Sequence, residues 1–309
     1  MSTNSHNFPK DLLSISDLNS EQIEEVLDAA LTLKKNRHTH PKHLFGKTIG
    51  ILTSKPSLRT RLSFEIGLAE LGANSIFIKE EEIGLGQRES YEDVSRVISR
   101  LLSGLIIRSH KHENVAQMAQ IAKIPIINAL TNLEHPCQIL ADFLTVKEYF
   151  GQLKDIKICF IGDGNNVSIS LMLGSAIAGL NCTVITPPGH EPPKSSVDKA
   201  TQLAKHFGSQ MPSITNDIQA ADSANILYTD VWISMGQDTS KDKALRTFEN
   251  YQINNQTTRN GEIPVLHCLP AHKGEEITEE IFEKNADLIF TQAENRLHSQ
   301  KSLLVKLLC

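Results

Sequence analysis

Hydroxyl and guanidinium groups gather at one strand-to-helix turn, in Ser57-Leu58-Arg59-Thr60-Arg61. An apolar run typical of a buried strand precedes the turn at 48–53, and a helix-like stretch follows at 60–71. A helix start offers free N–H groups and partial positive charge, and arginine adds forked cationic donors. The segment therefore predicts a phosphate site, although a solvated basic turn on the surface is the alternative interpretation.

Two further groups of donors lie in the first half of the chain. His135 and Gln138 open a predicted helix at 136–149, where they can donate to a carbonyl or amide. Arg108 follows a predicted strand at 104–107, and open α/β sheets bind ligands at the carboxyl ends of their strands. A structural histidine and a structural salt bridge are the respective alternatives.

The segment Gly162-Asp163-Gly164-Asn165-Asn166 follows a predicted strand at 157–161. It is similar to the start of a dinucleotide-binding turn, but Val167 stands where a third small residue is needed. No acidic residue ends the next predicted strand, at 182–186, so NAD binding is not the favoured interpretation. The paired asparagines suit the carboxylate and ammonium of an amino acid instead.

Three more candidates follow later strand-like runs. Asp230 follows 225–229 and is a candidate ammonium partner, while Cys268 follows 264–267 and by default is an inert buried thiol. Arg296 lies beyond the last predicted strand, at 287–290. Polar clusters at strand ends from both halves of the chain predict one cleft between two domains.

Strand-like and helix-like runs alternate along the chain, which predicts an α/β fold of two domains, each a mainly parallel sheet flanked by helices, with the active site in the interdomain cleft. The domain boundary is expected near 148–155. A polar segment at 236–262 is either a mobile loop over a site or a solvated helical excursion. The remaining expected strands are 75–79 and 124–127, and the remaining expected helices are 91–103, 113–122, 167–178 and 195–207.

Composition narrows the class of protein. The 309 residues are 40% hydrophobic and 22% charged with a net charge of −5, which is typical of a soluble globular protein and argues against nucleic-acid binding. No apolar run approaches the ~20 residues of a membrane span, and the first residues lack the pattern of a secretory signal. Five scattered cysteines fit a reducing cytoplasm, with each thiol expected in the core.

Taken together, four motifs resemble the aspartate/ornithine carbamoyltransferase family over nearly the whole chain, and the last two resemble its ornithine branch. The motifs are Ser57-x-Arg59-Thr60-Arg61, His135-Pro136-Cys137-Gln138, Asp230-Val231-Trp232-Ile233-Ser234-Met235-Gly236 and His267-Cys268-Leu269-Pro270.

The resemblance implies a carbamoyl phosphate-binding domain at 1–148, an ornithine-binding domain at 149–295 and a C-terminal helix, 296–309, that returns to the first domain. It also implies a homotrimer or a multiple of trimers, in which a neighbour's loop around 80–90 completes each site. No metal, organic cofactor, nucleic acid or membrane is implied.

Residue roles follow from the matched positions. The implied phosphate ligands are Ser57, Leu58 through its backbone N–H, Arg59, Thr60 and Arg108. The implied carbamoyl ligands are His135, Gln138, Leu269 and Arg296, with Thr60 and Arg108. The implied ornithine ligands are Asn166, Asp230, Ser234 and Met235, with Cys268 at the side-chain amine. The implied catalytic residues are Cys268, Arg108, His135 and Asp230.

Two positions depart from the family pattern: Leu58 stands where threonine is usual, and Gly84 where glutamine is common. A hydrogen bond to a charged group contributes roughly 1.5–3 kcal/mol, so loss of the threonine hydroxyl predicts at least a tenfold weaker phosphate affinity.

The implied reaction transfers a carbamoyl group from carbamoyl phosphate to the side-chain amine of L-ornithine. An amine with a pKa of about 10.4 needs roughly 4.6 kcal/mol to lose its proton at pH 7, so the site must lower that pKa or supply a base. Cys268 coupled to Asp230, or the departing phosphate, is the candidate base. Transfer to another amine (putrescine, aspartate or an acylated ornithine) and a weakly active or non-catalytic binding paralogue remain alternatives. Synthesis and breakdown of citrulline use the same groups.

Overall fold

Two compact units make up the computed structural model, which describes residues 8–54, 57–86, 88–232 and 241–309. Unit 1 contains the chain up to Leu144 together with Arg296–Cys309, and unit 2 contains Thr145–Asn295. The helices α6 (Pro136–Phe150) and α11 (Ala286–Leu308) contribute residues to both units.

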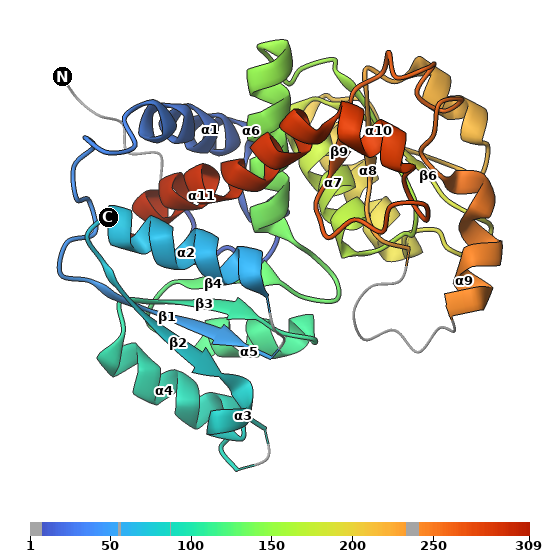
Figure 1. Cartoon of the computed structure of the whole chain (residues 1–309). Helices are drawn as coiled ribbons and strands as arrows, with labels where there is room; N and C mark the ends of the chain where they lie inside the picture. Colours follow the sequence, from blue (N-terminus) through green and yellow to red (C-terminus); the bar gives the residue numbers. More distant parts are fainter. Residues whose placement is uncertain (1–7, 55–56, 87, 233–240) are drawn as a thin grey trace. The chain divides into compact units, whose positions relative to one another are not determined.

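Unit 1 is built on a four-stranded parallel sheet with the strand order β2-β1-β3-β4 (Figure 1). The strands are β1 (Thr48–Thr53), β2 (Asn74–Lys79), β3 (Gly104–Arg108) and β4 (Ile126–Leu130). The central strand β3 is buried throughout because helices cover both faces of the sheet.

The helices of unit 1 begin where polar side chains can cap them. Asn19 caps α1 (Ser20–Lys35), Ser57 caps α2 (Leu58–Glu70) and Ser90 caps α4 (Tyr91–Leu101), each accepting a bond from a backbone N–H of the first turn. The short α3 (Glu80–Ile83) and α5 (His112–Ile121) complete the set. In Figure 1, α2 lies over one face of the sheet, and α4 and α5 lie over the other.

Unit 2 contains a five-stranded parallel sheet with the order β7-β6-β5-β8-β9. Its strands are β5 (Lys157–Ile161), β6 (Asn181–Ile185), β7 (Ser213–Thr215), β8 (Ile226–Thr229) and β9 (Val265–His267). Its helices are α7 (Asn166–Ala178), α8 (Lys194–Phe207), α9 (Lys241–Phe248) and α10 (Glu279–Lys284). Unit 2 also contains the short 3-10 helices η2 (Ile218–Ser223) and η3 (Glu249–Tyr251), whereas the 3-10 helix η1 (Ile15–Asp17) belongs to unit 1.

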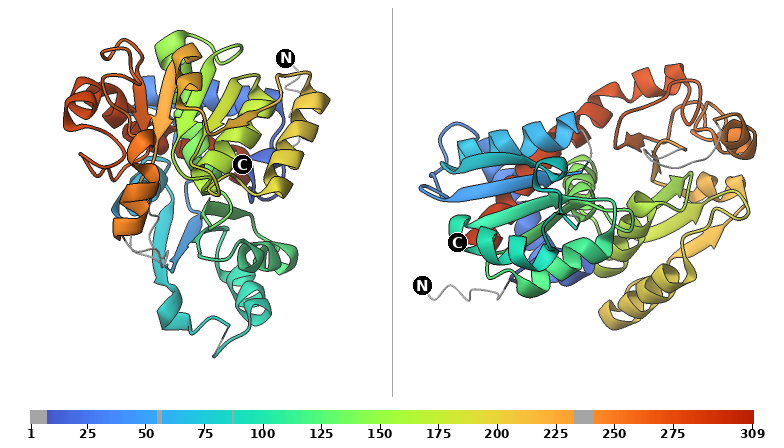
Figure 2. Two further views of the ribbon diagram at one scale, coloured as in Figure 1. Left: turned by 90° about the vertical axis from the view of Figure 1, so that its right-hand side faces the viewer. Right: turned by 90° about the horizontal axis from the view of Figure 1, so that it is seen from below.

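The expected strand at 287–290 is wrong, because these residues belong to the first turns of α11. Ile289 is fully buried whereas Phe290 is 55% exposed. A short apolar run does not distinguish a strand from one buried face of a helix, and here the helical spacing prevails. The expected C-terminal helix accordingly begins earlier than residue 296, and its end lies in unit 1 (Figure 2).

Four smaller observations complete the fold. The edge strand β7 was not expected from the sequence. In the segment 236–262, residues 236–240 lie outside the described part, and α9 and η3 occupy much of the rest, as the helical alternative predicts. Four cysteines are buried, but Cys309 is exposed, so the core expectation is wrong there. Within the described ranges, no helix combines the length and apolar character that a membrane crossing requires.

Candidate functional site

Each sheet has one point at which the chain reverses its direction of strand addition. In unit 1 that point lies between β1 and β3, and in unit 2 it lies between β5 and β8. Open α/β sheets bind ligands outside the carboxyl ends of the strands at such points, since the flanking connections leave to opposite sides. The turn bearing Ser57 and Thr60 follows β1, Arg108 ends β3, and Asp230 follows β8. These four predicted site residues therefore lie at the switch points of the two sheets.

The start of α2 is held by its own cap. Ser57 accepts a hydrogen bond from the Thr60 backbone N–H at 3.4 Å. Thr60 is buried with 3% exposure, whereas the Leu58 side chain is 71% exposed. The first turn of α2 thus directs the Thr60 hydroxyl into unit 1 and leaves the side chain of Leu58 outside it.

Two buried arginines converge on the Thr60 hydroxyl. The Arg296 Nη2 donates to Thr60 Oγ1 at 3.0 Å, and the Arg108 Nη1 lies 3.5 Å from the same oxygen. Both arginines are more than nine-tenths buried. Two guanidinium groups on one neutral oxygen leave their positive charge uncompensated by that contact, which favours an anion nearby.

The pKa of Arg108 reflects this concentration of charge. Burial, followed by the charges of the neighbouring Arg296 and Arg59, lowers the pKa of Arg108 to about 10. Arg108 nevertheless stays protonated at neutral pH, so the cluster keeps its cations. Among the described residues, no hydrogen-bond partner reaches the buried Arg108 Nε. The arrangement is suited to a doubly charged phosphate, whose oxygens would accept these N–H groups.

His135 contributes a neutral imidazole to the same unit. Burial, followed by the charges of Arg296 and Arg108, holds the pKa of His135 well below its ordinary value. A neutral ring can donate one N–H to a carbonyl oxygen without adding a further cation. Gln138, at the start of α6, donates its amide N–H to Asp142 at 2.9 Å, which orients the amide.

In unit 2, Asp230 is the centre of the polar contacts. Its Oδ1 accepts the Cys268 Sγ–H at 3.0 Å and the Val231 backbone N–H at 2.8 Å. Its Oδ2 accepts the Asn165 Nδ2–H at 2.9 Å. Asp230 and Cys268 are both about nine-tenths buried, so the carboxylate and thiol meet away from bulk water.

A buried pair supports the turn that follows β9. The His267 Nδ1 accepts the Leu269 backbone N–H at 2.9 Å, which places the ring proton on Nε2. That Nε2 then donates to Glu276 Oε1 at 3.1 Å, and neither side chain is exposed. The chain is bent here, with Leu269 at φ +60° and a cis Leu269-Pro270 peptide bond. Glu276 was not expected from the sequence, because an acidic pair in a polar loop looks like a solvated surface.

Three of the expected ornithine ligands, Asn166, Ser234 and Met235, are not among the residues described above as bonding to Asp230. Asn166 is the first residue of α7, but the asparagine that bonds Asp230 is Asn165, which also caps that helix. Ser234 and Met235 lie outside the described residues. Sequence reasoning identified the asparagine pair but not which member bonds Asp230.

Gly84 has a conformational explanation. It ends α3 with φ +65°, in the left-handed region that favours glycine. A Cβ atom there would also lie 2.8 Å from the Arg88 Cβ. The departure from glutamine at this position therefore follows from a tight turn.

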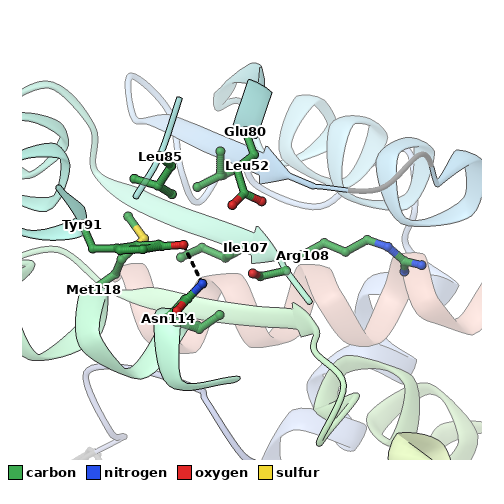
Figure 3. Close-up of a pocket in the computed structure, with 10 residues that line it drawn as sticks. Leu52, Glu80, Leu85, Tyr91, Ile107, Arg108, Asn114 and Met118 are labelled. Carbon is green, nitrogen blue, oxygen red and sulfur yellow. Dashed lines mark hydrogen bonds between the residues drawn. The ribbon is translucent and has the colours of Figure 1, made fainter. Parts of the chain in front are cut away.

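A small pocket lies beside β3, and Arg108 is one of the residues that line it. Tyr91, Asn114 and Glu80 contribute to its lining, and Asn114 Nδ2 donates to Tyr91 Oη at 2.5 Å. Figure 3 shows the guanidinium of Arg108 pointing away from this pocket. The charged end of Arg108 therefore does not face this pocket.

One group of potential metal ligands occurs among the described residues, in His272, Glu275 and Glu276. Glu276 Oε1 already accepts bonds from His267 and from the His272 backbone N–H. One oxygen of the carboxylate is therefore occupied within the protein, whereas the buried Oε2 has no hydrogen-bond partner among the described residues.

Comparisons with known proteins cover nearly the whole chain. Residues 10–148 match the description "Aspartate/ornithine carbamoyltransferase, carbamoyl-P binding domain", and residues 154–307 match "Aspartate/ornithine carbamoyltransferase, Asp/Orn binding domain".

Similar proteins carry related names. An ornithine carbamoyltransferase of Aquifex aeolicus is 44% identical over 298 residues, covering 96% of each chain. A catabolic ornithine carbamoyltransferase of Thermoplasma volcanium is 44% identical, covering 97% of this chain and 98% of the relative. The crystal structure of ornithine carbamoyltransferase from Gloeobacter violaceus has a TM-score of 0.87 at 40% identity, covering 98% of this chain and all of that one.

Proposed function

This chain belongs to the aspartate/ornithine carbamoyltransferase family, and from this premise we propose that it transfers the carbamoyl group of carbamoyl phosphate to the side-chain amine of L-ornithine. The products are L-citrulline and phosphate. The supporting names are those of relatives that cover nearly the full length of the chain.

The observation that carries the donor half of the proposal is the pair of buried guanidinium groups on Thr60. We assign the phosphate to the Ser57–Thr60 turn, with the backbone N–H of Leu58, and to Arg59 and Arg108. Partly or wholly desolvated cations bind a doubly charged phosphate strongly, since little water competes for its oxygens.

We assign the carbamoyl group mainly to neutral and cationic donors of unit 1. Neutral His135 and the oriented Gln138 amide suit the carbonyl oxygen and the amide nitrogen of the donor. Arg108, Arg296 and Thr60 would stabilise the oxyanion that forms when the carbonyl carbon is attacked, which is commonly the largest electrostatic contribution in acyl transfer. Leu269, which belongs to unit 2, is assigned to the carbamoyl group as well.

The acceptor half of the proposal rests on Asp230 and Cys268. We assign the ornithine to Asn166, Asp230, Ser234 and Met235, with the Cys268 thiol at the side-chain nitrogen. The carboxylate already accepts the thiol proton at 3.0 Å, so an incoming amine would find an acceptor for its proton. Burial favours the neutral amine, because desolvation lowers the pKa of an ammonium group.

The chemistry balances without an added cofactor. The ornithine Nδ forms a bond to the carbamoyl carbon, and the carbon–oxygen bond to phosphate then breaks. The proton lost from Nδ passes to the departing phosphate or to the Asp230–Cys268 pair. On this proposal, residues 1–148 bind carbamoyl phosphate, residues 149–295 bind ornithine, and 296–309 supply Arg296 to the donor site.

The surface of α2 supports an oligomer. Leu58, Leu62 and Ile66 recur every four residues along one helix face and are 71%, 45% and 40% exposed. A contiguous apolar face of this kind marks an interaction surface. We assign it to contact with a second copy in a homotrimer or a multiple of trimers, with the loop at 80–90 completing a neighbour's site.

This assembly can be tested by light scattering. Leu62→Glu should yield smaller species, whereas Val97→Glu on α4, where the valine is 53% exposed, should leave the mass unchanged. A wild-type monomer at micromolar concentration would contradict the assignment.

We place the protein in the cytoplasm and in arginine metabolism. Four of its cysteines are buried and none of the five forms a disulfide bond, which suits a reducing compartment. Since relatives include a catabolic enzyme, either direction of the reaction is compatible with the proposal.

A citrulline assay tests the proposal directly. Purified protein is given carbamoyl phosphate with ornithine, putrescine, aspartate or N-acetylornithine, and each carbamoylated product is measured. Of the four amines, only ornithine is expected to be carbamoylated, and the rate of citrulline formation should fall at least tenfold in Cys268→Ala. A preference for another amine would support that alternative acceptor, and substrate binding without turnover would support the non-catalytic alternative.

A further inference from the structure

The loop that follows β6, residues 187–193, packs directly on the turn that follows β5. The Gly164 backbone N–H donates to the His190 carbonyl oxygen at 2.8 Å. A Cβ atom at Gly164 would lie 2.4 Å from the Pro192 nitrogen and 2.5 Å from the His190 oxygen. Only glycine permits this approach, so the position of the loop determines the position of the turn.

A side-chain bond strengthens this contact. His190 Nδ1 lies 3.0 Å from Asp163 Oδ1, and the carboxylate can only accept, so the proton is on Nδ1. The Asp163 side chain is 14% exposed and that of His190 is 36% exposed. The Thr186 hydroxyl donates to the His190 carbonyl oxygen at 2.8 Å, which fixes the backbone behind the ring.

The turn passes this constraint to Asp230. Asn165 follows Gly164 directly, accepts the Val167 and Ser168 N–H groups at the start of α7, and donates to Asp230 Oδ2. A displacement of the turn would therefore alter the bond that orients the Asp230 carboxylate.

The His190 ring makes a second contact, which leads through Phe248 to the segment that follows Asp230. The His190 ring packs edge-on against Phe248, with ring centroids 4.7 Å apart. Phe248 in turn stacks on Trp232 at 5.6 Å, and both are at least 95% buried. Trp232 stands two residues after Asp230, so His190 braces both segments that hold this carboxylate.

We propose that His190 is a positioning residue for the acceptor: its bond to Asp163 and its contact with Phe248 hold Asp230 in the orientation that binds the amino-acid substrate. The inference rests on the proposed transfer to ornithine. His190 touches no reacting atom, so its effect is exerted through Asn165 and Trp232.

The two contacts can be separated by substitution. His190→Phe keeps a ring against Phe248 but removes the donor to Asp163, whereas His190→Asn keeps a donor near the position of Nδ1. His206→Phe on α8 is the matched control, because that exposed histidine packs on Phe207 at 4.8 Å in a similar edge-on geometry.

Steady-state kinetics with each substrate varied provide the main measurement. His190→Phe should raise the KM for ornithine about threefold to tenfold, as loss of one hydrogen bond predicts, with the KM for carbamoyl phosphate unchanged. His190→Asn should recover most of the loss. In an Asp163→Asn background, His190→Phe should have little further effect, since the bond is already weakened.

Trp232 is the only tryptophan of the chain, so its fluorescence supplies a second measurement. L-Ornithine titrated in the presence of inorganic phosphate, which supports no carbamoyl transfer, should bind more weakly to His190→Phe than to the wild type by the same factor.

Two results would overturn the inference. One is an active wild type whose KM for ornithine is unchanged by His190→Phe. The other is an equal rise in both KM values together with a lower melting temperature, which would indicate a general structural role. A wild type that forms no citrulline would instead refute the proposed function, and the inference with it.

Discussion

Replacement of Arg108 by methionine should have opposite effects on stability and on donor binding. Arg108 is 8% exposed, and burial together with the charges of Arg296 and Arg59 lowers its pKa to about 10. Its contact with Thr60 Oγ1, at 3.5 Å, is a weak compensation. Without an anion, the cluster is therefore a region of buried like charges that destabilises the folded chain.

The magnitudes follow from these contacts. Replacement of a buried charge by an apolar side chain of similar length is neutral or stabilising by about 1–4 kcal/mol, so Arg108→Met should not lower the free energy of unfolding in phosphate-free buffer. Loss of a hydrogen bond to a charged ligand costs roughly 1.5–3 kcal/mol, which weakens phosphate binding about tenfold to hundredfold.

Phosphate should therefore stabilise the wild type more than the variant. At 100 times its dissociation constant, a ligand stabilises the wild type by ~2.7 kcal/mol. A variant that binds tenfold to hundredfold more weakly gains only ~1.4 to ~0.4 kcal/mol from the same concentration.

Chemical denaturation with and without inorganic phosphate measures both effects, and isothermal calorimetry gives the phosphate affinity directly. Arg100→Met is the matched control, because that arginine is on the exposed face of α4 and donates to the Arg96 carbonyl oxygen. The reasoning is refuted if Arg108→Met binds phosphate as the wild type does, or loses more than about 1 kcal/mol of stability in phosphate-free buffer, where a neutral or stabilising change is expected.

Three further predictions concern the remaining parts of the two clusters. The pKa of His135 lies well below about 6.5 in the folded protein, so the unfolded chain binds more protons below that pH. The free energy of unfolding should therefore fall on acidification from pH 7 to 5, and it should fall less steeply in His135→Gln. Chemical denaturation at each pH measures both. Glu276→Gln places an amide N–H in a fully buried position beside His267 and should cost about 1–3 kcal/mol of stability and reduce citrulline formation, with an unchanged KM for carbamoyl phosphate; a rise in that KM would contradict the role given to this pair. Leu58→Thr restores a hydroxyl at the first position of α2 and should lower the KM for carbamoyl phosphate about tenfold, and an unchanged KM would show that the backbone N–H of Leu58 suffices.

Local patterns of the sequence were sufficient for most of the regular elements. Apolar runs of four to six residues correspond to strands such as β1 and β5, because a strand of a parallel sheet is buried on both faces. The same rule failed at 287–290, where one buried residue in a short apolar run belongs to a helix. The three-residue β7 lies at a sheet edge and has too little pattern to detect.

That polar residues following strands of the same sheet lie close together was predictable, because the carboxyl ends of parallel strands meet at one edge. Their pairing was not, since it joins residues that are far apart in the chain. Arg108 is 48 residues from Thr60, and Arg296 is 236 residues from it. Similarly, Glu276 acquires its role only because the turn after β9 buries it against His267.

The residue types can be read directly from the order of the chain: guanidinium groups, an imidazole, a carboxylate and a thiol, most of them placed after strands. Which of them share a buried environment depends on the fold. Burial lowers the pKa values of His135 and Arg108, so the imidazole is neutral at pH 7. The fold also brings the Cys268 thiol to the Asp230 carboxylate. These effects depend on desolvation and distance, which no local pattern of residues contains.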